Sequence, residues 1–153
     1  MNYPDLVRKL FADGKVRYYE TISSGFSMFP TIWPKSDLKA EYVPLRDIKE
    51  GDIVIFQRGD RLVAHRVVKV GEEYLRSRGD SCLYLDEVVD ASNYLCKVVS
   101  YVLWKRVEVR EDSLYWKVQR WIFLHLRGAH KINHYFVLLL VKIVVMLGIH
   151  SKR

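Results

Sequence analysis

The residues best suited to chemistry are a serine in a predicted turn and a histidine in a predicted strand. Ser27 is flanked by Gly25, Phe26, Met28 and Pro30. Glycine allows a tight backbone turn because it has no Cβ, and the proline ring fixes the direction of the chain after the turn. A serine hydroxyl is a weak nucleophile that needs a base within hydrogen-bonding reach to remove its proton. Ser27 is therefore a candidate nucleophile, provided that the fold brings a base to it.

His65 is the candidate base, because residues 1–104 contain no other histidine. It lies in the run 62–68, whose alternating pattern predicts a strand. Downstream, Asp80 and Asp86 offer two carboxylates that can orient an imidazole, and a triad is defined by geometry and not by chain order. An aspartate after a turn glycine commonly accepts hydrogen bonds from the local backbone. This favours Asp86 as the third member and leaves Asp80 as the alternative.

Several short segments follow one another along residues 20–104. They are Ser27-Met28-Phe29-Pro30-Thr31, Gly51-Asp52-Ile53-Val54-Ile55-Phe56, His65-Arg66-Val67-Val68, Arg78-Gly79-Asp80 and finally Asp86. In this order they resemble the successive motifs of the signal peptidase I family. Histidine at position 65, where bacterial leader peptidases have a lysine base, is similar to the archaeal and endoplasmic-reticulum branch. Residues 24–28 also resemble the related self-cleaving repressor peptidases, which use lysine as the base.

The resemblance implies a β-rich peptidase fold with Ser27 as nucleophile, His65 as base, and Asp80 or Asp86 as the third member. It also implies an extended peptide substrate with small residues at the cleavage site. The chain departs from the family pattern in two ways. Residues 1–14 do not form an apolar membrane helix, and a basic, hydrophobic tail follows the peptidase-like part.

Composition separates this tail from the rest of the chain. Half of the 153 residues are apolar and 28% are charged, which predicts a packed domain. The whole net charge of +7 lies in residues 105–153, because acidic and basic residues balance in residues 1–104. The neutral part argues against nucleic acid as a ligand, and the basic tail favours an anionic surface. We therefore expect a serine peptidase-like β domain over residues 1–107 and a helical tail over residues 108–153.

The hydrophobic pattern predicts a mainly β fold with a short N-terminal helix and a C-terminal helical hairpin. Residues 58–61, Arg-Gly-Asp-Arg, have the composition of a hairpin turn. A helix is expected over residues 4–13, and a second one begins at Asp112 or Ser113 and ends at Gly128. The expected strands are 15–22, 38–43, 52–57, 62–70, 74–78 and 95–104.

Beyond Gly128, the apolar runs 135–141 and 143–147 are separated by Lys142. Together they are shorter than the ~20 residues that span a bilayer. We therefore expect a helical hairpin that lies in, or inserts shallowly into, an anionic membrane surface. A helical pair packed on the domain is the alternative. No cofactor or metal is expected, because His130 and His134 have no carboxylate or thiolate near them in the sequence.

The expected function is that of a membrane-associated serine endopeptidase that cleaves signal or leader peptides, on a side of the membrane that the sequence leaves open. One alternative is a processing peptidase that faces the cytoplasm and acts on another kind of substrate. The other is a catalytically inactive, membrane-associated binding module. The joint presence of Ser27, His65, Asp80 and Asp86 argues against an inactive module.

Overall fold

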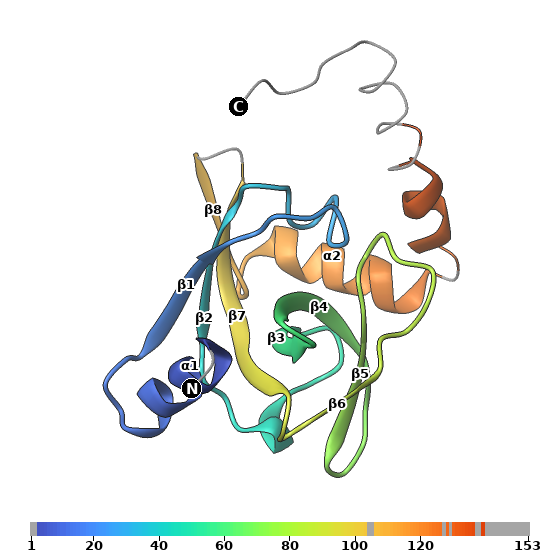
Figure 1. Cartoon of the computed structure of the whole chain (residues 1–153). Coiled ribbons are helices and arrows are strands. Elements are labelled where there is room, and N and C mark those ends of the chain that lie inside the picture. The colour runs from blue at the N-terminus through green and yellow to red at the C-terminus, as the bar shows by residue number, and fades with distance from the viewer. Residues whose placement is uncertain (1–2, 104–105, 127, 129, 137–138, 140–153) are drawn as a thin grey trace.

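The computed structural model describes residues 3–103, 106–126, 128, 130–136 and 139. Its largest element is one antiparallel sheet of eight strands, with one helix before the sheet and helices after its last strand (Figure 1). This confirms the predicted mainly β fold. The strands are β1 (Tyr18–Ile22), β2 (Asp37–Glu41), β3 (Ile53–Arg58), β4 (Arg61–Val70), β5 (Tyr74–Arg78), β6 (Val88–Asp90), β7 (Tyr94–Leu103) and β8 (Val107–Arg110).

Strand β7 connects the two halves of the sheet, because it pairs with β2, β3 and β8. The order along the sheet is β1-β2-β7-β3-β4-β5-β6, with β8 beside β7 and off this path. Figure 1 shows β1 and β2 on one side of the molecule, β5 and β6 on the other, and β3 and β4 between them. Among the described strands β1 pairs only with β2, so its other edge stays open.

The β3–β4 hairpin forms where the sequence predicts it. Arg58 pairs with Arg61, and the turn between them is made by Gly59 and Asp60. Gly59 has a φ of 59°, a left-handed conformation that glycine adopts without a steric penalty. In the register that this turn sets, His65 lies in the middle of β4, where it pairs with Val54 of β3.

Two short strands escaped the sequence prediction. β6 has three residues and β8 has four, too few for a clear alternation. β8 is held by its pairing with the end of β7, where Val109 lies opposite Tyr101. One predicted strand is longer than the observed one: the prediction covers residues 15–22, whereas β1 begins at Tyr18.

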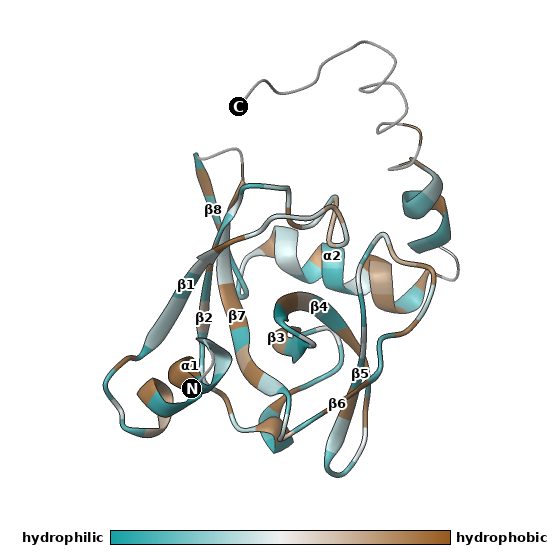
Figure 2. Cartoon of the chain, viewed as in Figure 1, coloured by the Kyte–Doolittle hydropathy of each residue, from teal (hydrophilic) through white to brown (hydrophobic). Residues whose placement is uncertain are grey.

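The core consists of two apolar clusters on the sheet. The larger one includes Val7 from the N-terminal helix α1 (Tyr3–Ala12) and Trp116 from α2 (Leu114–His125), so both helices pack on strands. The smaller one lies among β3 to β7 and includes Phe56 and Val67. Figure 2 shows the hydrophobic residues of the helices and strands alternating with hydrophilic ones, as half-buried elements require. A short 3₁₀ helix (Leu45–Asp47) precedes β3.

Helix α2 starts at the predicted place and belongs to the domain. The Ser113 hydroxyl accepts a hydrogen bond from the backbone N–H of Trp116 at 3.3 Å, which caps the first turn. The Trp116 ring then packs against Tyr101 of β7, with 5.3 Å between ring centroids. The helix ends at His125, before the predicted stop at Gly128.

The expected domain boundary lies between residues 107 and 108. It falls inside β8, and Val109 and Trp116, which lie beyond it, are part of the larger core cluster. The physical reason is that β8 completes the hydrogen bonding at the end of β7 while α2 covers the apolar surface there. Residues 108–125 are therefore an integral part of the β domain.

The rest of the tail is described only in part. Residues 130–136 are helical, and most of the two apolar runs lies outside the described residues. Within the part of the chain that is described, no helix combines the length and the apolar composition needed to cross a bilayer. The expected association with an anionic membrane stays a prediction.

The packing of α2 predicts that Trp116→Ala destabilises the fold far more than Trp121→Ala. The Trp116 side chain is 3% exposed and that of Trp121 is 54% exposed. Truncating a buried tryptophan to alanine costs about 3–5 kcal/mol, whereas surface substitutions usually change stability by no more than about 0.5 kcal/mol. Urea unfolding followed by circular dichroism measures both variants. Equal, small losses would show that α2 does not belong to the domain.

Candidate active site

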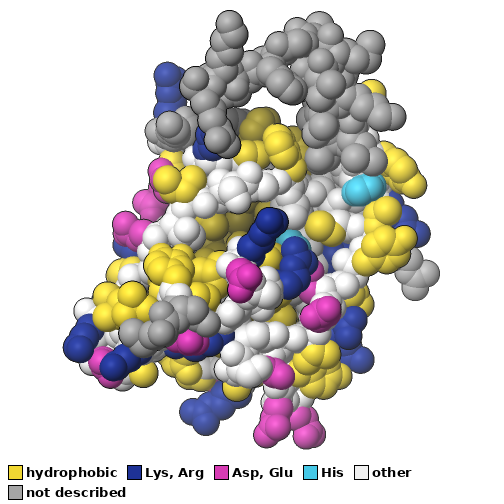
Figure 3. Space-filling view, in the orientation of Figure 1, with side chains coloured by type: hydrophobic (Ala, Val, Ile, Leu, Met, Phe, Trp, Pro, Cys, Tyr) yellow, Lys and Arg dark blue, Asp and Glu magenta, His cyan; other side chains and the backbone are white. Residues whose placement is uncertain are grey.

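A cleft of 830 Å³ opens between the turn after β1 and the loop after β5. Ser27, His65 and Asp86 all line it. Its apolar wall includes Met28 and Ile55. Figure 3 shows this face hollowed over an apolar floor, with basic and acidic groups beside the hollow. The cleft therefore offers an apolar surface beside the residues with catalytic potential.

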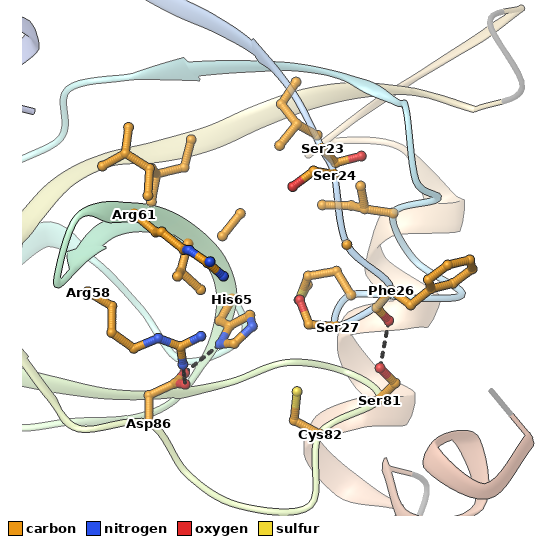
Figure 4. A pocket seen from close by; sticks show the side chains of 18 of the residues that line it. Ser23, Ser24, Phe26, Ser27, Arg58, Arg61, His65, Ser81, Cys82 and Asp86 are labelled. Atoms are coloured by element: carbon orange, nitrogen blue, oxygen red, sulfur yellow. Dashed lines mark hydrogen bonds and ion pairs between the residues drawn. The ribbon is translucent and has the colours of Figure 1, made fainter. Parts of the chain in front are cut away.

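The serine turn is held in place by buried neighbouring side chains and by hydrogen bonds from Ser81. Met28 and Phe29, which directly follow Ser27, are both buried, and they hold Ser27 at the cleft. Ser81 holds the turn from the β5 loop: its backbone N–H donates to the Ser27 carbonyl at 2.9 Å, and its hydroxyl donates to the Phe26 carbonyl at 2.6 Å. These bonds fix the serine backbone and leave the side chain facing the cleft (Figure 4).

His65 and Asp86 form a buried pair. The two residues are 2% and 8% exposed, and His65 Nδ1 lies 2.6 Å from Asp86 Oδ2. A carboxylate only accepts hydrogen bonds, so the proton of the neutral ring belongs on Nδ1 and the lone pair on Nε2. Ser77 and Arg58 also donate to Asp86, at 2.7 Å and 3.2 Å. The pair therefore presents an oriented imidazole whose Nε2 can accept a proton.

Asp80 has a different partner. Its carboxylate receives two hydrogen bonds from the Arg66 guanidinium, at 2.8 Å and 2.7 Å, and one from the Thr31 hydroxyl. Burial lowers the pKa of Arg66, but the charge and hydrogen bonds of Asp80 outweigh it and raise the pKa above its ordinary value. Asp80 thus balances a buried positive charge next to His65 in the chain. The structure brings Asp86, and not Asp80, to the imidazole.

Gly79 makes room for this arrangement. A Cβ atom at position 79 would lie 2.5 Å from the Ser27 carbonyl oxygen and 3.0 Å from His65 Nε2. Both distances are shorter than ordinary contacts, so any side chain at position 79 would collide with the serine turn and with the imidazole. A glycine at this position allows the β5 loop to pass close to both the serine turn and the imidazole.

Ser27 and His65 face one another across the cleft in Figure 4. The Ser27 hydroxyl makes no hydrogen bond to any residue that the structure describes. Catalytic hydrogen bonds are often long in a ligand-free site and shorten when substrate is bound. The Ser27 backbone N–H is likewise not engaged by any described residue, so it is available to an oxyanion. The residue two positions earlier is Gly25, which has no side chain and therefore supplies no second side-chain donor to the oxyanion.

Cys82 is a second nucleophilic side chain at the cleft. Its Sγ would lie 2.7 Å from a Cβ at position 79, which would also lie 3.0 Å from His65 Nε2. Burial raises the pKa of the Cys82 thiol, and the nearby Asp86 charge raises it further. A cysteine that acts as a nucleophile has a lowered pKa, because the thiolate attacks. The environment of Cys82 therefore favours Ser27 as the nucleophile.

Comparisons of the chain with protein-family models, with curated proteins and with solved structures found no match. The interpretation of the site rests on its own geometry.

Sequence reasoning found Ser27, His65 and the two candidate acids but missed their supports. Ser77 lies nine residues before Asp86, and Arg58 lies in the hairpin turn. Serine and arginine at such positions are ordinary surface or strand residues, so the sequence contains no signal for them. Among the described residues, no group of three or more His, Cys, Asp and Glu side chains gathers as a metal site would require.

The two aspartates should respond differently to the same substitution. Asp80→Asn leaves the Arg66 charge buried without its partner, and breaking such a pair costs about 3–5 kcal/mol of folding free energy. Asp86→Asn should cost less stability, because half-exposed Arg58 can turn to water. It should instead slow reaction with a serine-directed fluorophosphonate by about 10⁴-fold, through loss of the correct imidazole tautomer.

Urea unfolding and labelling rates distinguish the two roles. If Asp80→Asn labels slowly while keeping full stability, and Asp86→Asn labels normally, the assignment is reversed.

Proposed function

We propose that this chain is a serine endopeptidase with Ser27 as nucleophile, His65 as general base and Asp86 as the residue that orients the base. The main support is the buried His65–Asp86 hydrogen bond of 2.6 Å at the wall of a cleft that Ser27 lines from the opposite side. The sequence resemblance to the histidine-type branch of the signal peptidase I family implies the same nucleophile and the same base.

In the proposed reaction, His65 Nε2 takes the hydroxyl proton as Ser27 Oγ attacks the carbonyl carbon of the scissile peptide. The Ser27 N–H donates to the oxyanion that forms. The Asp86 carboxylate stabilises the imidazolium, which then gives its proton to the leaving amine. The acyl-enzyme that remains is hydrolysed by water, with His65 again acting as the base.

The proposed substrate is an extended peptide with small, apolar side chains near the scissile bond. Two observations support this. The cleft wall is rich in aliphatic side chains such as Leu62 and Ala64. Thr21 and Ile22, at the end of β1, also line it, and the free edge of β1 offers backbone groups to an added strand. These features suit a signal or leader peptide and also suit other apolar segments.

Two alternatives remain as proposals. A processing peptidase that faces the cytoplasm would use the same chemistry on another substrate. An inactive binding module would keep the cleft without turnover. The oriented tautomer of His65 has no purpose in simple binding, which argues for the enzyme.

The full-length protein should react covalently with a fluorophosphonate probe at Ser27. Ser27→Ala should abolish labelling, and His65→Ala should slow it by at least about 10⁴-fold, because nucleophile and base act as one unit. Intact-mass measurement followed by peptide mapping identifies the modified residue. Cys82→Ser is the matched control for the neighbouring nucleophile. Labelling that survives Ser27→Ala and disappears in Cys82→Ser would contradict the proposal.

We also propose that the tail attaches the peptidase to an anionic membrane surface, since residues 127–153 contain five basic and no acidic residues. Each basic residue near such a surface contributes about 1 kcal/mol. Flotation with vesicles that contain phosphatidylserine should recover the full chain and not a chain ending at residue 126, which keeps α2. Equal recovery of both chains, or no recovery at low salt, would contradict this attachment.

A further inference from the structure

The helical stretch 130–136 lies against the two segments that form the candidate site. His130 Nε2 is 3.4 Å from Arg78 Nη1, and His134 Nδ1 is 2.8 Å from the Ser81 carbonyl oxygen. The Phe136 ring stacks on Phe29, with 6.3 Å between centroids. Within the described part of the chain, every polar side-chain contact that this helix makes outside itself goes to residues 26–29 or 78–81.

Asn133 makes the closest connection. Its side-chain amide nitrogen donates to the Asp80 carbonyl at 3.1 Å and also to the Phe29 carbonyl. An amide NH₂ group has two hydrogens, so one side chain satisfies both acceptors. Phe29 lies two residues after the proposed nucleophile, and Asp80 directly follows Gly79, which lies close to both the Ser27 carbonyl and His65 Nε2. Asn133 therefore ties the nucleophile turn to the loop that sets its distance from the base.

His134 supports the same loop from the neighbouring helix position. A carbonyl oxygen only accepts, so His134 Nδ1 must donate its proton to Ser81. Ser81 in turn donates through its backbone to Ser27 and through its hydroxyl to Phe26. A chain of hydrogen bonds thus runs from the helix through Ser81 to the backbone of the nucleophile. His134 itself lines the cleft.

The opposite side of this helix is free of such contacts. Lys131, Ile132 and Tyr135 are exposed. The helix is separated from α2 by Gly128, whose φ of 86° breaks the helical path. Its position against the site is therefore set by the contacts of Asn133, His134 and Phe136.

From this geometry we infer that Asn133 and His134 are positioning residues for the proposed reaction, which hold Ser27 at reacting distance from His65. The inference rests on the proposed peptidase function. It adds a requirement that the β domain up to residue 125 does not contain: the nucleophile is aligned only when the helix 130–136 is in place. Small displacements of a reacting atom, of about 1 Å, can cost about 100-fold in rate.

The test compares single substitutions in the full-length protein. Asn133→Ala removes both donated hydrogen bonds and improves helix propensity, so a loss cannot come from a weakened helix. Asn133→Asp keeps the shape but turns the donor into an acceptor that faces two carbonyl oxygens. Lys131→Ala, on the exposed side of the same helix, is the matched control. His134→Asn retains an N–H donor near the Nδ1 position, whereas His134→Ala does not.

Two readouts are needed. The first is fluorophosphonate labelling, resolved into the maximal rate of inactivation and the half-saturating concentration. We expect Asn133→Ala and Asn133→Asp to lower the maximal rate by about 10- to 100-fold, with the half-saturating concentration changed less than about threefold because probe binding is not affected. His134→Asn should keep more of the rate than His134→Ala. Lys131→Ala should label like the wild type.

The second readout is amide hydrogen exchange of the segments 26–31 and 79–82, which does not depend on catalysis. Faster exchange in both segments of the Asn133 variants, together with the lower maximal rate, supports the inference. Unchanged exchange, or faster exchange with an unchanged maximal rate, overturns it. A wild-type protein that shows no labelling dependent on Ser27 overturns the proposed function, and the positioning role with it, whatever the exchange shows.

Discussion

The site depends on the hydrogen bonds that the buried guanidinium of Arg66 donates. It donates two hydrogen bonds to Asp80 and one, at 3.2 Å, to Thr31. These two partners lie in the loop that contains Gly79 and in the segment that follows the serine turn, and Arg66 is the chain neighbour of His65 on β4. A buried charge is tolerated only when its partners stay in place. The need to satisfy one arginine therefore fixes three segments relative to one another.

The two aspartates show how position gives the same side chain two different tasks. Both Asp80 oxygens accept hydrogen bonds from Arg66, so this carboxylate neutralises the buried guanidinium. Asp86 lies at the far end of the same loop and meets His65 there, and its backbone N–H is anchored on the Ser77 carbonyl at 2.9 Å. One carboxylate holds the frame together, and the other orients the base.

The sequence predicted what depends on local pattern. The alternation around His65, the turn at Gly59 and the cap of α2 are readable because each depends on neighbours in the chain. It could not predict what depends on distant packing. β8 is too short to alternate, and its existence requires the end of β7. In the sequence, Asn133 is an ordinary polar residue in a basic tail. Its hydrogen bonds to the carbonyl groups of residues 29 and 80 exist only because the fold brings these residues together.

The central claim is that Asp86 holds His65 with its proton on Nδ1 and a free lone pair on Nε2, directed at Ser27. Long-range ¹H–¹⁵N correlation spectra of the histidine side chains measure this tautomer directly, above the pH at which the ring is protonated. The account predicts that His65 in the full-length protein is the Nδ1–H tautomer and that Asp86→Asn removes this preference. A His65 ring with its proton on Nε2, or one that exchanges freely between tautomers, would contradict it.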